Sequence, residues 1–189
     1  MPAIGLVVAG PYDAAVLEVF TRRLRPGVSV VSRLCGNDAG VLRTCSARLR
    51  EFERGDLGRP VERAVIVCDS HQADPAALDN RLRASLTGSR VSFPVRHVVI
   101  IRELEAWLLA DHAALARLAA ERGRPTNFLP LNFPPEQLPD PKGKLTALLQ
   151  QAGVGYTHVV AGRLAEHSDL DLIEGLCPSF TSFKRAVAR

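Results

Sequence analysis

Lysine is scarce in this sequence, and its cysteines lack the spacings of a metal-bound or disulfide-bonded scaffold. Only three of the 24 basic residues are lysine. The net charge of +4 is mildly basic, and the arginine bias can reflect genome composition as easily as phosphate binding, so charge alone does not decide whether the protein binds nucleic acid. The cysteines form no Cys-x-x-Cys pair. Structural zinc and a disulfide framework are therefore not expected.

Long apolar runs and targeting signals are also missing. No apolar run approaches the roughly 20 residues that a membrane helix needs. The first apolar stretch, residues 3–9, is too short for a signal peptide and has no basic leader before it. We therefore expect a cytoplasmic protein that makes no contact with a membrane.

The common phosphate-binding and nucleophile motifs are absent as well. The stretch AGPYD at residues 9–13 has one glycine, lacks the Lys-Ser/Thr end of a P-loop and fails the G-x-G-x-x-G pattern. A Ser-His-acid triad is formally possible, but the chain has no Gly-x-Ser-x-Gly elbow to carry its serine.

Apolar strands alternate with amphipathic helices over the first 122 residues. We predict strands at 4–9, 28–34, 63–69 and 93–101, and helices at 11–24, 39–54, 75–86 and 102–121. The strands are nearly continuous Val/Ile/Leu runs, which are typical of strands buried on both faces of a parallel sheet. The sequence thus predicts an α/β fold in residues 1–123, with a mostly parallel central sheet of about four strands flanked by helices.

The composition changes at residues 124–141, which hold six of the thirteen prolines. Such a segment cannot be a regular helix or a central strand, so we expect a connector. Beyond it, short helices are predicted at 142–153, 157–167, 168–176 and 178–188, with Ser168 and Asp171 spaced as a capping pair. Residues 142–189 have too little core to fold alone. We expect them to form a C-terminal helical extension packed on the sheet domain.

Acidic residues follow the predicted strands. In open α/β sheets the ligand site lies outside the carboxyl ends of the strands. Acids gathered at one edge repel each other unless a cation lies among them, and hard divalent cations take oxygen ligands. The pattern therefore indicates a metal site at this edge, formed from Asp13, Asp38, Asp69, Glu103 and Glu105.

Simpler roles are available to most of these acids. Asp38 and Asp74 fit helix N-caps better than ligands. Asp13 suits the first turn of its helix about as well as a site, and Glu103 fits a solvated face. Asp69 is harder to explain in this way, because it directly ends a buried strand and a whole loop separates it from the next helix.

The predicted helix at 102–121 carries two further acids of interest. Asp111 falls inside its apolar stripe, where a carboxylate must find a partner or a cation. Glu105 lies on the flank of that stripe, so it can point from the start of the helix toward the strand ends. The stripe consists of Leu104, Trp107, Leu108, Leu115 and Leu118.

The order of these pieces resembles the TOPRIM fold, and within it small prokaryotic TOPRIM-like proteins akin to RloB and to the nuclease domain of OLD-type enzymes. That family carries Glu-Gly-x-x-Asp after the first strand, Asp-x-Asp after the third and Glu-x-Trp-Leu-Leu-x-Asp on a later helix. The corresponding stretches here are AGPYD, CDSHQAD and ELEAWLLAD, and DPKGKL at 140–145 also resembles a family segment. The resemblance covers most of the chain.

Two positions depart from the family pattern. Ala9 stands where the TOPRIM glutamate would serve as metal ligand and general acid/base, and alanine can neither bind a cation nor move a proton. His71 replaces the second aspartate of Asp-x-Asp. A histidine can still bind a transition metal such as Mn²⁺, although carboxylates suit Mg²⁺ better.

The resemblance implies a nucleic-acid phosphodiester hydrolase that uses Mg²⁺ or Mn²⁺ and acts in phage defence beside an ATPase partner. Asp69, His71 and Glu105 would be the catalytic metal ligands. Supporting ligands would be Asp13 and Asp111, and the phosphates would meet Arg102, Lys142 and Lys144. Ala9 favours a rival expectation, a TOPRIM-like binding or regulatory module that keeps the fold and has lost the chemistry.

Overall fold

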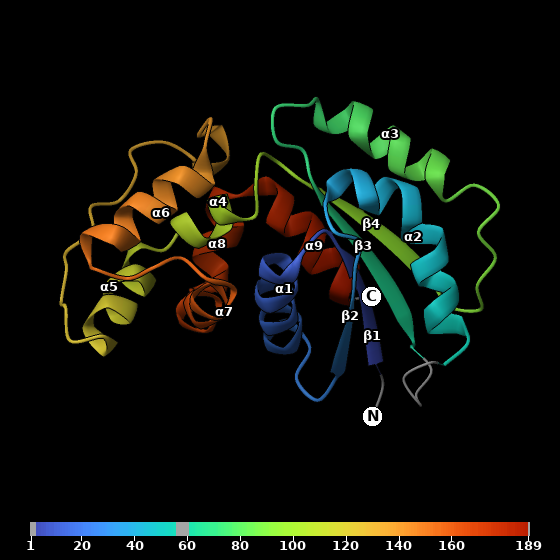
Figure 1. The fold of residues 1–189 in the computed structure, drawn as a ribbon, viewed down its shortest axis with the longest axis horizontal. Helices are drawn as coiled ribbons and strands as arrows, with labels where there is room; N and C mark the ends of the chain where they lie inside the picture. Colours follow the sequence, from blue (N-terminus) through green and yellow to red (C-terminus); the bar gives the residue numbers. More distant parts are fainter. Residues whose placement is uncertain (1–2, 56–60, 189) are drawn as a thin grey trace.

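Four strands form one all-parallel sheet in the computed structural model, which describes residues 3–55 and 61–188 (Figure 1). The order across the sheet is β2-β1-β3-β4. Every neighbouring pair is parallel. The predicted α/β class with a parallel central sheet of about four strands is confirmed. The strands are β1 (Ala3–Val8), β2 (Ser29–Leu34), β3 (Arg63–Asp69) and β4 (Val95–Ile100).

The two central strands are the most apolar in sequence and the most buried in space. All six residues of β1 are buried, as are Ala64–Cys68 of β3. The edge strand β2 contains two serines and an arginine, and none of its residues is fully buried. A strand covered on both faces must be apolar on both faces, so the sequence pattern separates central from edge strands.

Helices cover both faces of the sheet (Figure 1). On one face lie α1 (Pro11–Leu24) and α9 (Pro178–Ala188), and on the other lie α2 (Asp38–Glu53) and α3 (Pro75–Ser85). Because side chains alternate along a strand, β1 divides its residues between two cores. Ile4, Leu6 and Val8 join the core under α1 and α9, and Ala3 and Val7 join the core under α2 and α3.

The helices between β4 and α9 are short and gather beyond α1 (Figure 1). Here α7 packs on α1, and α9 packs on β4. Among the described residues no helix is long and apolar enough to cross a membrane. The elements are α4 (Glu105–Leu109), α5 (His112–Glu121), the 3-10 turn η1 (Pro135–Gln137), α6 (Pro141–Gln151), α7 (His158–His167) and α8 (Leu170–Leu176).

The side chain of Trp107 contacts three elements of the fold. It is fully buried and lies edge-on to Phe180 of α9, with ring centroids 5.1 Å apart. Its indole N–H donates to Ser179 Oγ at 2.9 Å and to Glu136 Oε1 at 3.2 Å. A buried indole N–H needs such a partner, so Trp107 fixes α4, η1 and α9 against one another.

The prediction of one long helix at 102–121 is wrong. Arg102 has a positive φ of 65°, and the helical region is divided into α4 and α5. Asp111 is extended rather than helical, and its carboxylate caps α5 by accepting the amide of Ala114 at 3.0 Å. A side-chain acceptor that replaces the missing backbone partner starts a new helix. The helical spacing of the apolar residues therefore continues across a break between two helices.

The predicted capping pair of Ser168 and Asp171 is also wrong. Asp169 caps α8, and it accepts the amides of Asp171 and Leu172. Ser168 instead donates its hydroxyl to the carbonyl of Leu164, at the end of the preceding helix. The cap is therefore one residue further along than the sequence spacing indicated.

Candidate acidic site at the strand ends

A cavity of about 240 Å³ lies at the carboxyl ends of the strands, where parallel strands place the residues that follow them. Its charged lining is mainly acidic, with one lysine and one histidine. Small residues complete the wall near the end of β1. The lining residues are Ala9, Gly10, Pro11, Tyr12, Asp13, Gly36, Asp38, Asp69, His71, Glu103, Glu105 and Lys142.

Asp69 is the last residue of β3, and its carboxylate interacts with three other acids of the cavity. Its carboxylate accepts the amide of Leu104 at 3.3 Å. Burial raises the pKa of Asp69 well above its usual value, and the negative charges of Asp13, Asp38 and Glu105 raise it further. A single backbone donor does not offset these effects, so this carboxyl binds its proton unusually tightly.

Asp13 combines the two roles that the sequence left open. It lies in the first turn of α1 and accepts the amide of Gly10 at 2.7 Å, and it also lines the cavity. Burial raises the pKa of Asp13 to about 6, although the hydrogen bond from Gly10 opposes the shift. The charges of Asp38 and Glu105 add to the effect of burial.

Asp38 is not the helix cap that the sequence indicated. Asn37 caps α2 by accepting the amide of Gly40 at 2.7 Å. The carboxylate of Asp38 is turned toward the cavity, where Oδ1 accepts the amide of Asp69 at 2.9 Å and Oδ2 lies 2.9 Å from His71 Nε2. The N-cap prediction for Asp74 is confirmed, since it accepts the amide of Ala77 at 3.0 Å.

His71 lies between two carboxylates. Its Nδ1 is 3.3 Å from Glu103 Oε1, and its Nε2 faces Asp38. Burial lowers the pKa of His71, but the hydrogen bonds and charges of Asp38 and Glu103 outweigh that effect and raise the pKa overall. Both ring nitrogens are thus engaged, and a metal ion would have to displace one of these contacts.

Glu103 is part of this site and not of a solvated face, so that interpretation was wrong. Its side chain is 19% exposed. Besides facing His71, it accepts the amide of Lys142 at 3.0 Å. This bond joins the segment after β4 to the start of α6, so Glu103 brings the two halves of the chain together at the cavity.

Glu105 begins α4 and is nearly buried, with 6% of its side chain exposed. Its Oε1 accepts the hydroxyl of Tyr156 at 3.0 Å and lies 3.7 Å from Lys142 Nζ. Burial raises the pKa of Glu105, and the charge of Lys142 offsets this only in part. The ammonium of Lys142 also lies over the ring of Tyr12, 5.0 Å from its centroid.

The donor set suits a hard divalent cation in its chemistry. Four carboxylates, those of Asp13, Asp38, Asp69 and Glu105, contribute oxygen ligands of the kind that Mg²⁺ and Mn²⁺ take. Over residues 3–55 and 61–188, however, no three His, Cys, Asp or Glu side chains are placed so that they could hold a metal ion together. The residues fit by donor type, and side chains would have to turn for several of them to reach one ion.

Three of the predicted site residues lie elsewhere. Asp111 is 2% exposed, and its Oδ2 accepts Arg117 Nη2 at 3.1 Å and the amide of Asp169 at 2.9 Å. The predicted burial of this carboxylate with hydrogen-bonding partners is confirmed. Asp111 does not line the cavity, however, and so is not part of the site. Arg102 donates Nη1 to the carbonyl of His71 at 3.3 Å. Lys144 lines a separate cavity beside the connector.

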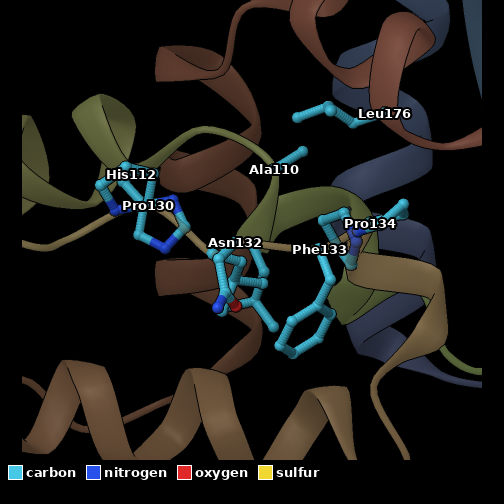
Figure 2. A pocket seen from close by; sticks show the side chains of 10 residues that line it. Ala110, His112, Pro130, Asn132, Phe133, Pro134 and Leu176 are labelled. Atoms are coloured by element: carbon cyan, nitrogen blue, oxygen red, sulfur yellow. The ribbon is translucent and has the colours of Figure 1, made fainter.

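A second cavity, of about 340 Å³, has a different character (Figure 2). Figure 2 shows Ala110 and Leu176 on one side of it, with Phe133 and Pro134 of the connector opposite. Of the described residues that line it, His112 is the one that titrates, and burial lowers the pKa of that imidazole. Without a carboxylate among those lining residues, this cavity offers no cation site, so the acidic cavity is the better candidate for chemistry.

Comparison with known proteins gives a family but no activity. Residues 44–188 match a family described as a domain of unknown function, DUF4276. The chain belongs to the DUF4276 family. No curated protein and no solved structure matches the chain. The part that matches DUF4276 includes Asp69, Glu105 and Lys142, whereas Asp13 and Asp38 precede it, so the acidic cavity spans the start of the match.

Proposed function

We propose that this DUF4276 protein is a TOPRIM-like phosphodiester hydrolase of nucleic acid that depends on Mg²⁺ or Mn²⁺. One observation carries the proposal: Asp13, Asp69 and Glu105, which match acids of the TOPRIM-like motifs, line one cavity at the carboxyl edge of a parallel sheet. These motifs lie far apart in sequence, and a purely structural role would not require them to meet.

Asp69, Asp13 and Glu105 would hold the cation, with Asp38 beside them. Such a cation would neutralise charge on a phosphate and would make water more acidic. Lys142 places a further positive charge 3.7 Å from Glu105, where it can meet a phosphate. Both ring nitrogens of His71 face carboxylates, those of Asp38 and Glu103, so His71 would hold these two acids in place rather than bind the cation.

The residue that moves a proton must come from outside position 9, because Ala9 has no acid. Asp13 lines the same cavity, but it would act as a base only while it does not hold the cation, because a bound cation lowers the pKa of a carboxylate. Loss of a positioned base typically costs about 10² to 10⁴ in rate. We therefore expect weak nuclease activity for the isolated protein.

The resemblance to RloB-like and OLD-type proteins supports the wider setting that we propose. The protein would act in the cytoplasm, in defence against phage, with an ATPase as its partner. Neither DNA nor RNA is favoured by the cavity itself, because phosphates are common to both.

One observation favours a second candidate function, a binding or regulatory module without catalysis. The methyl group of Ala9 lines the cavity where the TOPRIM-like motif has its glutamate. A site that lacks this acid can keep a cation, a phosphate or a partner without cleaving a bond.

The test is a calorimetric titration of Mn²⁺ and of Mg²⁺ into the full chain, beside Asp69→Ala and the control Asp74→Asn. Asp74 caps α3 outside the cavity, so its variant should bind like the wild type. Binding that Asp69→Ala abolishes supports the site, and absence of binding in the wild type refutes it. Cleavage of single- and double-stranded DNA and RNA with Mn²⁺ then separates the two functions: an activity lost in Asp69→Ala means an enzyme, and cation binding without cleavage means the module.

A further inference from the structure

The carboxylate of Asp38 reaches across the end of a strand that is not its own. Asp38 begins α2, which follows β2, and its two oxygens meet Asp69 and His71 at the end of β3. The sheet order places β1 between β2 and β3. Neighbouring strands lie about 4.8 Å apart, so these contacts bridge roughly 10 Å over the end of β1.

The loop after β2 holds Asp38 in this place. The amide of Cys35 extends the pairing by donating to the carbonyl of Val8 at 3.0 Å. Gly36 then turns the chain with a φ of 90°, and α2 starts so close to β2 that a Cβ at Gly40 would collide with the carbonyl oxygen of Cys35. This tight turn directs the first residue of α2 over the neighbouring strand.

Residue 9 lies under that bridge. Ala9 packs with the core on the α2 side of the sheet, as Val7 does, whereas Val8 faces the other side. A side chain at position 9 therefore projects toward the start of α2, and both Ala9 and Asp38 line the same cavity. An alanine takes up less of this shared cavity than an acid would.

We infer that Asp38 is a positioning residue of the acidic site and that it and residue 9 form an exchange pair. Asp38 supplies a carboxylate and fixes Asp69 and His71 because residue 9 is small and uncharged. An acid at position 9 and the acid at position 38 would compete for one space. This inference rests on the proposed function for its cation-binding consequence, but not for the competition itself.

Electrostatics give the competition its direction. The charge of Asp38 already raises the pKa of both Asp13 and Asp69. A glutamate at position 9 would add a carboxylate beside these acids, which is unfavourable without a cation. An asparagine at position 38 would keep an oxygen that can accept the amide of Asp69 while removing the charge.

The test compares the wild type, Ala9→Glu, Asp38→Asn and the double variant as full chains, by thermal unfolding and by titration with Mn²⁺. We expect Ala9→Glu alone to lower the melting temperature by about 4 °C. We expect Asp38→Asn alone to weaken Mn²⁺ binding about tenfold, as loss of a residue that orients metal ligands does. The double variant should recover both properties. In the matched control, Ala9→Glu with Asp74→Asn, the changes in melting temperature of the two single variants should add.

Additive effects of Ala9→Glu and Asp38→Asn in thermal unfolding would overturn the exchange pair. Wild-type Mn²⁺ affinity in Asp38→Asn would overturn the positioning role. Should the wild type bind no Mn²⁺, the proposed function fails, and thermal unfolding still decides whether the two positions compete. Asp38→Ser, which keeps an acceptor without a charge, replaces Asp38→Asn if that variant does not fold.

Discussion

Asp13 and Asp111 both accept a backbone hydrogen bond at the start of a helix, but their surroundings differ. Asp111, at the junction of α5 and α8, receives bonds from the amides of Ala114 and Asp169 and from Arg117. Asp13, in the acidic cavity, receives the amide of Gly10 and lies among like charges. Asp111 thus has three donors from the protein, whereas Asp13 has the amide of Gly10 and lies beside other acids.

This difference separates a structural carboxylate from a responsive one. The loss of a buried acid with matched donors leaves those donors unpaired. A buried acid among other acids is relieved by a proton or by a cation. The junction of α5 and α8 is therefore expected to depend on its acid for stability, and the acidic cavity on the solution around it.

The largest effect should come from pH. The pKa of Asp13 is raised from 3.8 to about 6, so the folded protein holds a proton that the unfolded chain has released over this interval. Stability from this group is present at low pH and is lost as pH rises from about 4 to about 6. A shift of this size corresponds to the order of 3 kcal/mol.

Urea unfolding between about pH 4 and about pH 7 measures this effect, with Asp13→Asn as the comparison. The difference in free energy of unfolding between the two chains should change across the interval, because the asparagine of the variant cannot titrate. Saturating Mn²⁺ should flatten the wild-type curve if the cation replaces the proton. Parallel curves for the two chains would place Asp13 among the structural carboxylates.

A smaller loss is expected for Asp111→Ala. The substitution leaves the amides of Ala114 and Asp169 without their acceptor, which typically costs about 1 to 3 kcal/mol. Asp111→Asn keeps one acceptor oxygen and should lose less. An unchanged melting temperature for the alanine variant would mean that these bonds contribute nothing to the junction of α5 and α8.

Tyr156→Phe should cost less again, about 0.5 to 1.5 kcal/mol. The phenol donates to Glu105 at 3.0 Å, and its removal takes away the one neutral donor that meets this acid among the described side chains. The pKa of Glu105 should then rise further. Tyr12→Phe is the matched control, since its hydroxyl makes only a long bond of 3.4 Å to the carbonyl of Tyr156. Equal denaturation curves for Tyr156→Phe and the wild type would remove Tyr156 from the site.

Most of the fold could be predicted from the sequence because its apolar runs are unambiguous. The run before Asp69 became β3, and the pair Asp74 and Pro75 marked the start of α3. The break at Asp111 was missed because the apolar residues stay in helical phase on both sides of it. Periodicity detects which side of a helix is buried, and a cap inside the pattern does not disturb it.

The site was partly predictable for a related reason. Asp69 could be placed because it ends a strand, and strand ends of one parallel sheet meet at one edge. The contact between Asp38 and Asp69 could not be placed, because it depends on the strand order β2-β1-β3. No sequence pattern indicates that Tyr156 belongs to the site either, since it contacts Glu105 from 51 residues away in the sequence. Such contacts arise only from the tertiary fold.

The smallest stability change is expected for Lys142→Ala. Its side chain is 52% exposed, and its ammonium lies 3.7 Å from Glu105. Ion pairs of this kind contribute about 0 to 1 kcal/mol. Lys144→Ala is the matched control, since Lys144 is exposed on the same helix but lines another cavity. Both variants should therefore unfold almost like the wild type.

The two lysine variants should differ in what the acidic cavity can do. The charge of Lys142 lowers the pKa of Glu105, so Lys142→Ala should raise that pKa. The pH range over which the protein loses stability should then shift to higher pH in Lys142→Ala and stay unchanged in Lys144→Ala. Under the proposed function, Lys142→Ala should also weaken binding of a labelled oligonucleotide in the presence of Mn²⁺, measured by fluorescence anisotropy. Equal losses of affinity in both variants would mean a diffuse attraction by surface charge, and would separate the acidic cavity from phosphate binding.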